Sequence, residues 1–218
     1  MATAGPWAMT TDRLILAQIL SPTFPIGSYA YSQGLEQAML DGKVTDAATL
    51  TDWIAAVLRH GSGRVDAILL AHARKGDDLD AFADLALAYA ASAERATEMR
   101  DQGAAFGQVV AAITGAAQPA LPYAIALGHA TRNLNLPTPE ILALFLHSLA
   151  AQLVSAAVRF LPLGASEGQA ALNRLAPLIT DLATECTTAP LSALASSTLG
   201  ADIAAMRHET LPVRIFRS

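Results

Sequence analysis

Apolar residues recur at helical spacing along almost the whole of this chain, and no other feature constrains its fold as strongly. Leu50, Ile54, Val57 and Leu58, for example, share one face of a helix. Sustained alternation with a period of two is absent, and β-branched residues do not gather into runs, so the sequence indicates no strands. The pattern predicts an all-α fold, with about nine or ten helices packed as one bundle-like domain over residues 1–218.

Local signals predict where several helices begin and end. Asp46 and Ser62 are suited to N-caps, and Gly61 and Gly76 are suited to the positions where helices stop. Further helices are expected at residues 92–114, 122–133, 139–161, 166–186 and 190–207. Chain ends commonly fray, so about residues 1–10 and 209–218, the second a C-terminal tail, are expected to be flexible in the free protein.

One uncharged stretch is long enough to be mistaken for a membrane span. Residues 141–158 contain 18 residues without a formal charge. Ser148, Gln152 and Ser155 nevertheless recur at helical spacing on one stripe, opposite a face that includes Leu146 and Leu153. We therefore expect a buried central helix and no membrane partner.

Charge and cysteine content exclude several classes of protein. The formal net charge is −5 and the sequence pI is about 5.4. Nonspecific nucleic-acid binding needs a clustered basic face, which this chain lacks, so no nucleic-acid partner is expected. Cys186 is the single cysteine and cannot form an intrachain disulfide, and the N-terminus does not read as an export signal. A cytoplasmic location is expected.

The motifs of common enzymes are missing or incomplete. Gly42-Lys43 is followed by Val44 and lacks the upstream glycine of a phosphate-binding P-loop. His208-Glu209 does not continue into the second histidine of a zinc-protease motif, and the five histidines lack the spacing of metal ligands. We therefore expect no catalytic, cofactor-binding or metal-binding site.

Residues 21–36, SPTFPIGSYAYSQGLE, combine prolines, glycines and aromatic residues ahead of an expected helix over about residues 29–41. The prolines fix the local backbone, so Phe24, Tyr29 and Tyr31 are expected to lie close together. Two interpretations remain open: the aromatic residues fill a corner of the core, or they form an ordered recognition loop.

The last dozen residues concentrate cationic and aromatic side chains, namely Arg207, His208, Arg214, Phe216 and Arg217. Arginine beside aromatic residues is typical of binding hot spots. Composition alone is also compatible with a disordered chain end that has no role.

Four blocks in the same order resemble the urease accessory protein F family. They are residues 21–36, Glu98-Met99-Arg100 with Gly103, residues 159–169 (RFLPLGASEGQ) and residues 202–218 (DIAAMRHETLPVRIFRS). Together these blocks span nearly the whole chain. The sequence departs from the family pattern at Leu211-Pro212-Val213, where relatives commonly carry a polar and aromatic stretch.

The resemblance implies a non-catalytic scaffold for assembly of the nickel centre of urease. Such a protein bridges accessory protein D and the GTPase accessory protein G during GTP-dependent nickel insertion into apo-urease, and it forms a homodimer. Glu98 and Arg100 are then best interpreted as structural or interface ion partners. The resemblance implies partner-binding roles for Phe24, Tyr29, Tyr31, Ser32, Gln33, Glu36, Glu98, Arg100, Arg207, His208, Glu209, Arg214, Phe216 and Arg217.

Two alternatives from other classes stay open at the level of sequence. One is a helical adaptor or regulator of a different GTPase. The other is an enzyme whose pocket is formed by residues far apart in the chain.

Overall fold

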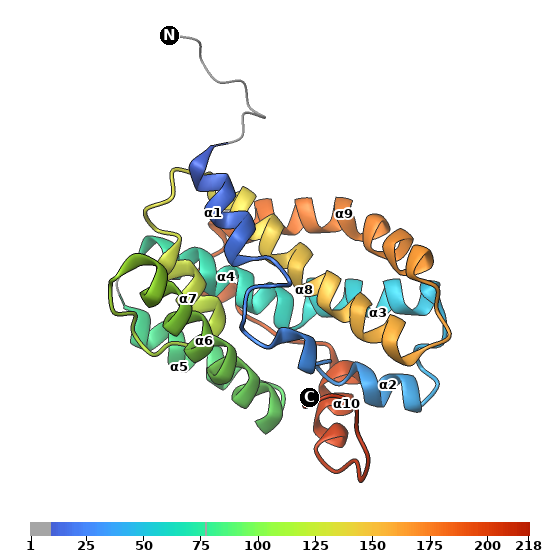
Figure 1. Ribbon diagram of the computed structural model, residues 1–218. Helices are drawn as coiled ribbons and strands as arrows, with labels where there is room; N and C mark the ends of the chain where they lie inside the picture. The colour runs from blue at the N-terminus through green and yellow to red at the C-terminus, as the bar shows by residue number, and fades with distance from the viewer. Residues whose placement is uncertain (1–9, 77) are drawn as a thin grey trace.

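A computed structural model describes residues 10–76 and 78–218 and confirms the all-α prediction (Figure 1). Within these ranges there are ten α-helices and two short 3₁₀ helices, η1 and η2, and no strand. The bounds are α1 Thr11–Ile19, η1 Ser28–Ala30, α2 Leu35–Leu40, α3 Ala47–His60, α4 Ser62–Lys75, α5 Leu79–Ala88, α6 Ala93–Thr114, α7 Tyr123–Ala130, α8 Thr138–Phe160, α9 Ala165–Thr188, η2 Leu191–Ala193 and α10 Leu199–His208. Nearly all of the N-terminal segment that was expected to be flexible lies outside the described residues.

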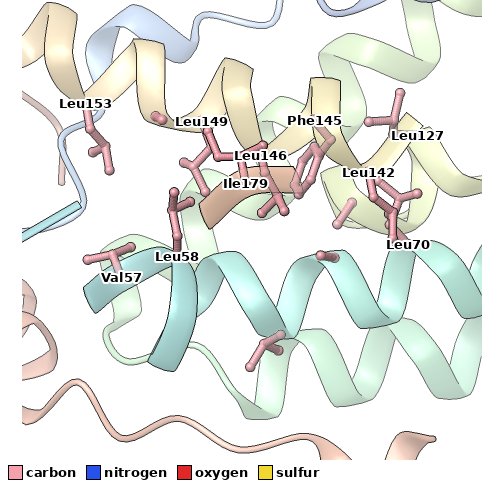
Figure 2. Packing of buried hydrophobic residues seen from close by; sticks show 14 of the residues in the cluster. Val57, Leu58, Leu70, Leu127, Leu142, Phe145, Leu146, Leu149, Leu153 and Ile179 are labelled. Atoms are coloured by element: carbon pink, nitrogen blue, oxygen red, sulfur yellow. The ribbon is translucent and has the colours of Figure 1, made fainter. Parts of the chain in front are cut away.

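Helix α8 lies at the centre of the molecule and packs against α9, α4, α3 and α2. Its apolar face meets side chains from three of these neighbours, as Figure 2 shows. The residues labelled in that figure are Val57, Leu58, Leu70, Leu127, Leu142, Phe145, Leu146, Leu149, Leu153 and Ile179, and all of them are buried. This burial is the main stabilising contribution to the fold.

The same helix is the one span in the described ranges that is long and apolar enough to cross a membrane by length and composition. Of its most apolar 18-residue window, 56% is buried inside the protein, as expected for a core helix. Its polar stripe of Ser148, Gln152 and Ser155 lines a groove of about 590 Å³ between α1, the loop that follows α1, and α8. The stripe therefore faces a groove whose lining is mostly apolar, and not the packed core.

Several helix ends follow the predicted local chemistry. Asp46 caps α3 through its side chain and forms a capping box with Thr49. Gly61 and Gly76 end α3 and α4 as expected, but the N-cap of α4 is Gly61 and Ser62 is the first helical residue. The hydroxyl of Ser62 instead donates a hydrogen bond to the side-chain oxygen of Gln33.

Two expected helices are wrong in extent. The helix predicted from residue 29 is interrupted because Gln33 and Gly34 have φ angles of 54° and 78°, which a continuous helix cannot accommodate. Gly34 also lies against α10, where a Cβ would come within 2.5 Å of the Ala205 nitrogen. The helix expected over residues 190–207 is split into η2 and α10, and the amide of Ser197 in the intervening segment bonds to the His60 carbonyl.

Gly103 and Gly107, one turn apart in α6, allow a direct test of close packing. A Cβ on Gly103 would lie 1.9 Å from the Leu121 carbonyl oxygen, whereas the nearest atom to a Cβ on Gly107 is 3.5 Å away in the Gln118 side chain. We expect Gly103→Ala to lower the free energy of unfolding by about 2 kcal/mol or more, because the neighbouring backbone must move. Gly107→Ala should leave it unchanged or raise it by up to about 1 kcal/mol, because alanine favours the helix. Urea titrations followed by circular dichroism measure both, and equal effects would contradict the packing argument.

Candidate partner-binding site around the C-terminal tail

The tail, residues 209–218, lies folded back against the protein, and two of its side chains are buried there. Phe216 and Ser218 are each only 2% exposed. The amide and the hydroxyl of Ser32 both donate to the Ser218 carbonyl oxygen, and the Arg217 amide donates to the Ala30 carbonyl. The loop before α2 therefore holds the tail through backbone contacts that composition alone did not indicate.

Glu36, in the first turn of α2, is the main acceptor for the tail. Its side chain is 2% exposed, and its two oxygens accept the amide hydrogens of Ile215 at 2.8 Å and Phe216 at 2.9 Å. Nε2 of His208 lies 3.1 Å from the same carboxylate. Figure 1 shows α2 and α10 side by side at one end of the molecule, near the C-terminus.

The N-terminus of α6 supplies the second group of contacts. Glu94 lies 2.6 Å from Nδ1 of His208 and also pairs with Arg214 of the tail. Glu209 accepts hydrogen bonds from the amides of Ala93 and Glu94, at 2.7 and 3.3 Å. These amides have no partner within the helix, so the first residue of the tail satisfies donors that α6 would otherwise leave open.

Glu98, one turn further along α6, is fully buried and has a complete set of donors. One oxygen accepts from the side-chain amides of Gln33 and Gln102, at 3.2 and 3.0 Å. The other accepts from Arg95 at 3.0 Å and from the Ser218 hydroxyl at 3.3 Å. Because an unpaired buried carboxylate is costly, these donors fix the loop, α6 and the end of the tail relative to one another.

Arg95 joins this arrangement to α4, where it pairs with Asp66 at 2.6 Å. Burial raises the pKa of Asp66, although the Arg95 guanidinium opposes the shift. Removing the Asp66 carboxylate from water costs free energy, and pairing with Arg95 offsets that cost. The pair therefore fixes how α6 packs against α4 more than it adds to the stability of the fold.

Two arginines cover the aromatic side chains of the site. The guanidinium of Arg159 lies 4.7 Å from the ring centre of Phe216 and also donates to the Tyr29 carbonyl at 2.7 Å. Arg217 lies 5.4 Å from the ring centre of Tyr31, whose hydroxyl donates to Asp101 at 3.1 Å. Burial raises the pKa of Tyr31 to about 12, so its hydroxyl stays protonated and acts as a donor.

The aromatic residues of the loop do not form the single cluster expected from sequence. Phe24 is buried against Phe106, with ring centres 5.6 Å apart, and Tyr31 is buried beside the tail. Tyr29 is 70% exposed. The three side chains therefore have different surroundings.

The structure thus divides the predicted partner-binding residues into two groups. Phe24, Tyr31, Ser32, Gln33, Glu36, Glu98, His208 and Phe216 are buried, and all of these except Phe24 lie in or beside the tail's binding region. Tyr29, Arg100, Arg207, Glu209, Arg214 and Arg217 are exposed to solvent. Only the second group is accessible to another protein while the tail is docked.

Sequence reasoning missed several residues that build the site. Glu94 precedes Glu98 by four residues, so helical spacing alone places both on one face of α6 and could have drawn attention to Glu94. Arg159 and Ser218 lie within the blocks 159–169 and 202–218, but neither was predicted to be a residue of the site. Within the described ranges, no group of three or more histidine, cysteine, aspartate or glutamate side chains is arranged to hold a metal ion.

These features define an all-α protein whose C-terminal segment is folded over a buried ionic cluster and presents arginines at the surface. A family model described as UreF matches residues 44–176, and the chain belongs to the UreF family. The urease accessory protein UreF of Cereibacter sphaeroides strain KD131 is 57% identical over 210 residues, which cover 96% of this chain and all of that protein. The urease accessory proteins UreF of Paracoccus denitrificans and Dinoroseobacter shibae are 52% and 45% identical, over 94% and 96% of this chain and over 96% and 100% of their own lengths. Membership of this family supports a role in urease maturation.

Adjacent tail residues provide a test of how the tail is held. We expect Phe216→Ala to release the tail, because truncating a buried phenylalanine costs on the order of 3 kcal/mol. Ile215→Ala is the matched control: its side chain is 64% exposed, and its amide contact with Glu36 is retained. Hydrogen exchange of residues 215–218, measured by mass spectrometry, should accelerate strongly in the first variant and little in the second. Unchanged exchange in Phe216→Ala would show that backbone contacts alone hold the tail.

Proposed function

We propose that this protein is a non-catalytic scaffold that bridges urease accessory protein D and the GTPase accessory protein G during GTP-dependent insertion of nickel into apo-urease. Family membership supports the role in urease maturation. We infer the bridging role from the tail, because residues 209–218 lie against the protein and present a defined surface to which a partner can bind. The protein acts in the cytoplasm as a homodimer, without contact with nucleic acid or membrane.

The observation that carries this proposal is the contrast between the buried and exposed residues of the tail. Phe216 and Ser218 point inward and fix the backbone, while Arg214 and Arg217 remain 41% and 62% exposed at their side chains. Arg207 of α10 is similarly accessible and pairs with Asp41 at 2.5 Å. Each of these guanidinium groups is oriented by a carboxylate of this chain and is still partly exposed, so it can also contact carboxylates of a partner with little loss of side-chain freedom.

The buried members of the predicted site have a different role in this proposal. Glu36, Glu98 and Ser32 do not touch the partner but hold the tail in the conformation that the partner recognises. Tyr29 and Arg100 lie on the exposed surface and contribute direct contacts. Chemistry on nickel and nucleotide is left to the partners.

Recruitment of the GTPase is the step to measure. We expect deletion of residues 214–218 to abolish co-purification with accessory protein G in the presence of accessory protein D, with helicity nearly unchanged. The double variant Arg214→Ala, Arg217→Ala should weaken co-purification by at least about tenfold while the tail stays docked, because the contacts of residues 215, 216 and 218 are retained. Arg174→Ala, at an exposed position on α9, is the control.

The cellular counterpart is urease activity with and without the gene. Loss of activity and of urease-bound nickel in the deletion strain, restored by the wild-type chain and not by the truncated one, would support the proposal. Full urease maturation without this protein would refute it. Binding to another GTPase with no effect on urease would point instead to a helical adaptor of different purpose.

A further inference from the structure

A small cavity lies where α4, α5, α6 and α10 meet the end of the tail. The volume open to the centre of a water-sized sphere is about 40 Å³. Its polar lining includes Ser62, Asp66, Arg95 and Ser218. One water molecule needs about 10 to 15 Å³ of such volume, so the cavity has room for at least one.

Asp66 contributes a carboxylate oxygen that has no donor in the protein. Its side chain is only 6% exposed, and Oδ2 accepts a hydrogen bond from Nη2 of Arg95 at 2.6 Å. Oδ1 accepts none from any residue in the described ranges, and it is not sealed off from water. Because a buried carboxylate oxygen without a donor costs free energy, this atom calls for a donor inside the cavity.

Arg95 contributes the complementary group. Its side chain is 10% exposed, and its Nη2 and Nη1 atoms pair with Asp66 and Glu98. The remaining ring-like edge of the guanidinium, Nε–H, donates to no group in the part of the chain that the structure describes. The same ion pair therefore presents one free acceptor and one free donor.

Two hydroxyl groups of the lining can accept further hydrogen bonds. The Ser62 hydroxyl donates to the Gln33 side chain at 3.1 Å, and the Ser218 hydroxyl donates to Glu98 at 3.3 Å. A hydroxyl oxygen has two lone pairs in addition to its hydrogen. The only acceptor contact of either hydroxyl within the described ranges is a long one, 3.4 Å from the Gln33 amide nitrogen to Ser218.

This mixture of groups decides which ligand fits the cavity. A bare cation would lie beside the Arg95 guanidinium, and an anion would lie beside the carboxylates of Asp66 and Glu98. An apolar group would leave Oδ1 of Asp66 and Nε of Arg95 unpaired. Water both donates and accepts, and a buried water typically makes about three hydrogen bonds.

We propose that this cavity is a binding site for ordered water, which donates to Oδ1 of Asp66 and accepts from Nε of Arg95. The water adds a second link between α4 and α6 beside the direct ion pair. Such a bridge is nearly as favourable in enthalpy as a direct hydrogen bond. The site is a property of the isolated chain and does not depend on the identity of any partner.

A high-resolution crystal structure of the full-length protein tests the proposal. We expect density for a water oxygen about 2.5 to 3.0 Å from Oδ1 of Asp66. An empty cavity would overturn the proposal. So would an anomalous signal at this position after sodium in the buffer is replaced by rubidium, because that result would assign the site to a cation.

Ala86→Val and Ala151→Val form a matched pair of variants. Ala86 of α5 is 1% exposed and lines the cavity but not the groove beside α8, whereas Ala151 of α8 lines the groove but not the cavity. Both changes carry the cost of placing valine in a helix. We expect Ala86→Val to remove the water density and to lower the urea midpoint more than Ala151→Val does, because methyl groups cannot donate to Asp66.

The opposite results are equally clear. A higher urea midpoint for Ala86→Val than for Ala151→Val would show that the cavity is a void that is better filled, and would overturn the proposal. Water density retained in Ala86→Val would also overturn it, whatever the midpoint, because the site would then lie elsewhere. If Ala86→Val does not fold, the wild-type crystal structure decides.

Discussion

The arrangement of this protein's functional end depends on carboxylates that are buried and must be supplied with donors. Glu36 and Glu98 are 2% and 0% exposed, and neither can remain ionised in the interior without several hydrogen bonds. The donors come from the loop before α2, from α6, from α10 and from the tail. Packing of α8 makes the fold stable, but these two side chains decide how the four segments meet.

Sequence sufficed for most of the fold because apolar spacing reports directly which face of each helix is buried. The long helices α6, α8 and α9 were predicted to within two residues at each end. The errors fall where a distant segment sets the backbone. Gly34 has a left-handed conformation and lies against Ala205, 171 positions later in the sequence. No local sequence pattern indicates that these two residues pack together.

Only part of the candidate site could be predicted from the sequence, for a related reason. Composition drew attention to the loop and to the tail, and both lie in the site. Composition could not show that Phe216 faces inward and Arg217 outward. The tail backbone is oriented by contacts with Glu36 and Ser32, about 180 residues away in the chain. The groups that contact the tail are likewise not its neighbours in sequence.

The separation between Glu36 and the tail has a consequence for synthesis. Their contacts join residues 179 and 180 positions apart, so Glu36 leaves the ribosome long before Ile215 and Phe216 are made. Until then its carboxylate stays in water and the start of α6 lacks the cap that Glu209 provides. Unfinished chains therefore cannot display the completed surface, and a truncated product is distinguishable from an intact one by this end of the molecule alone.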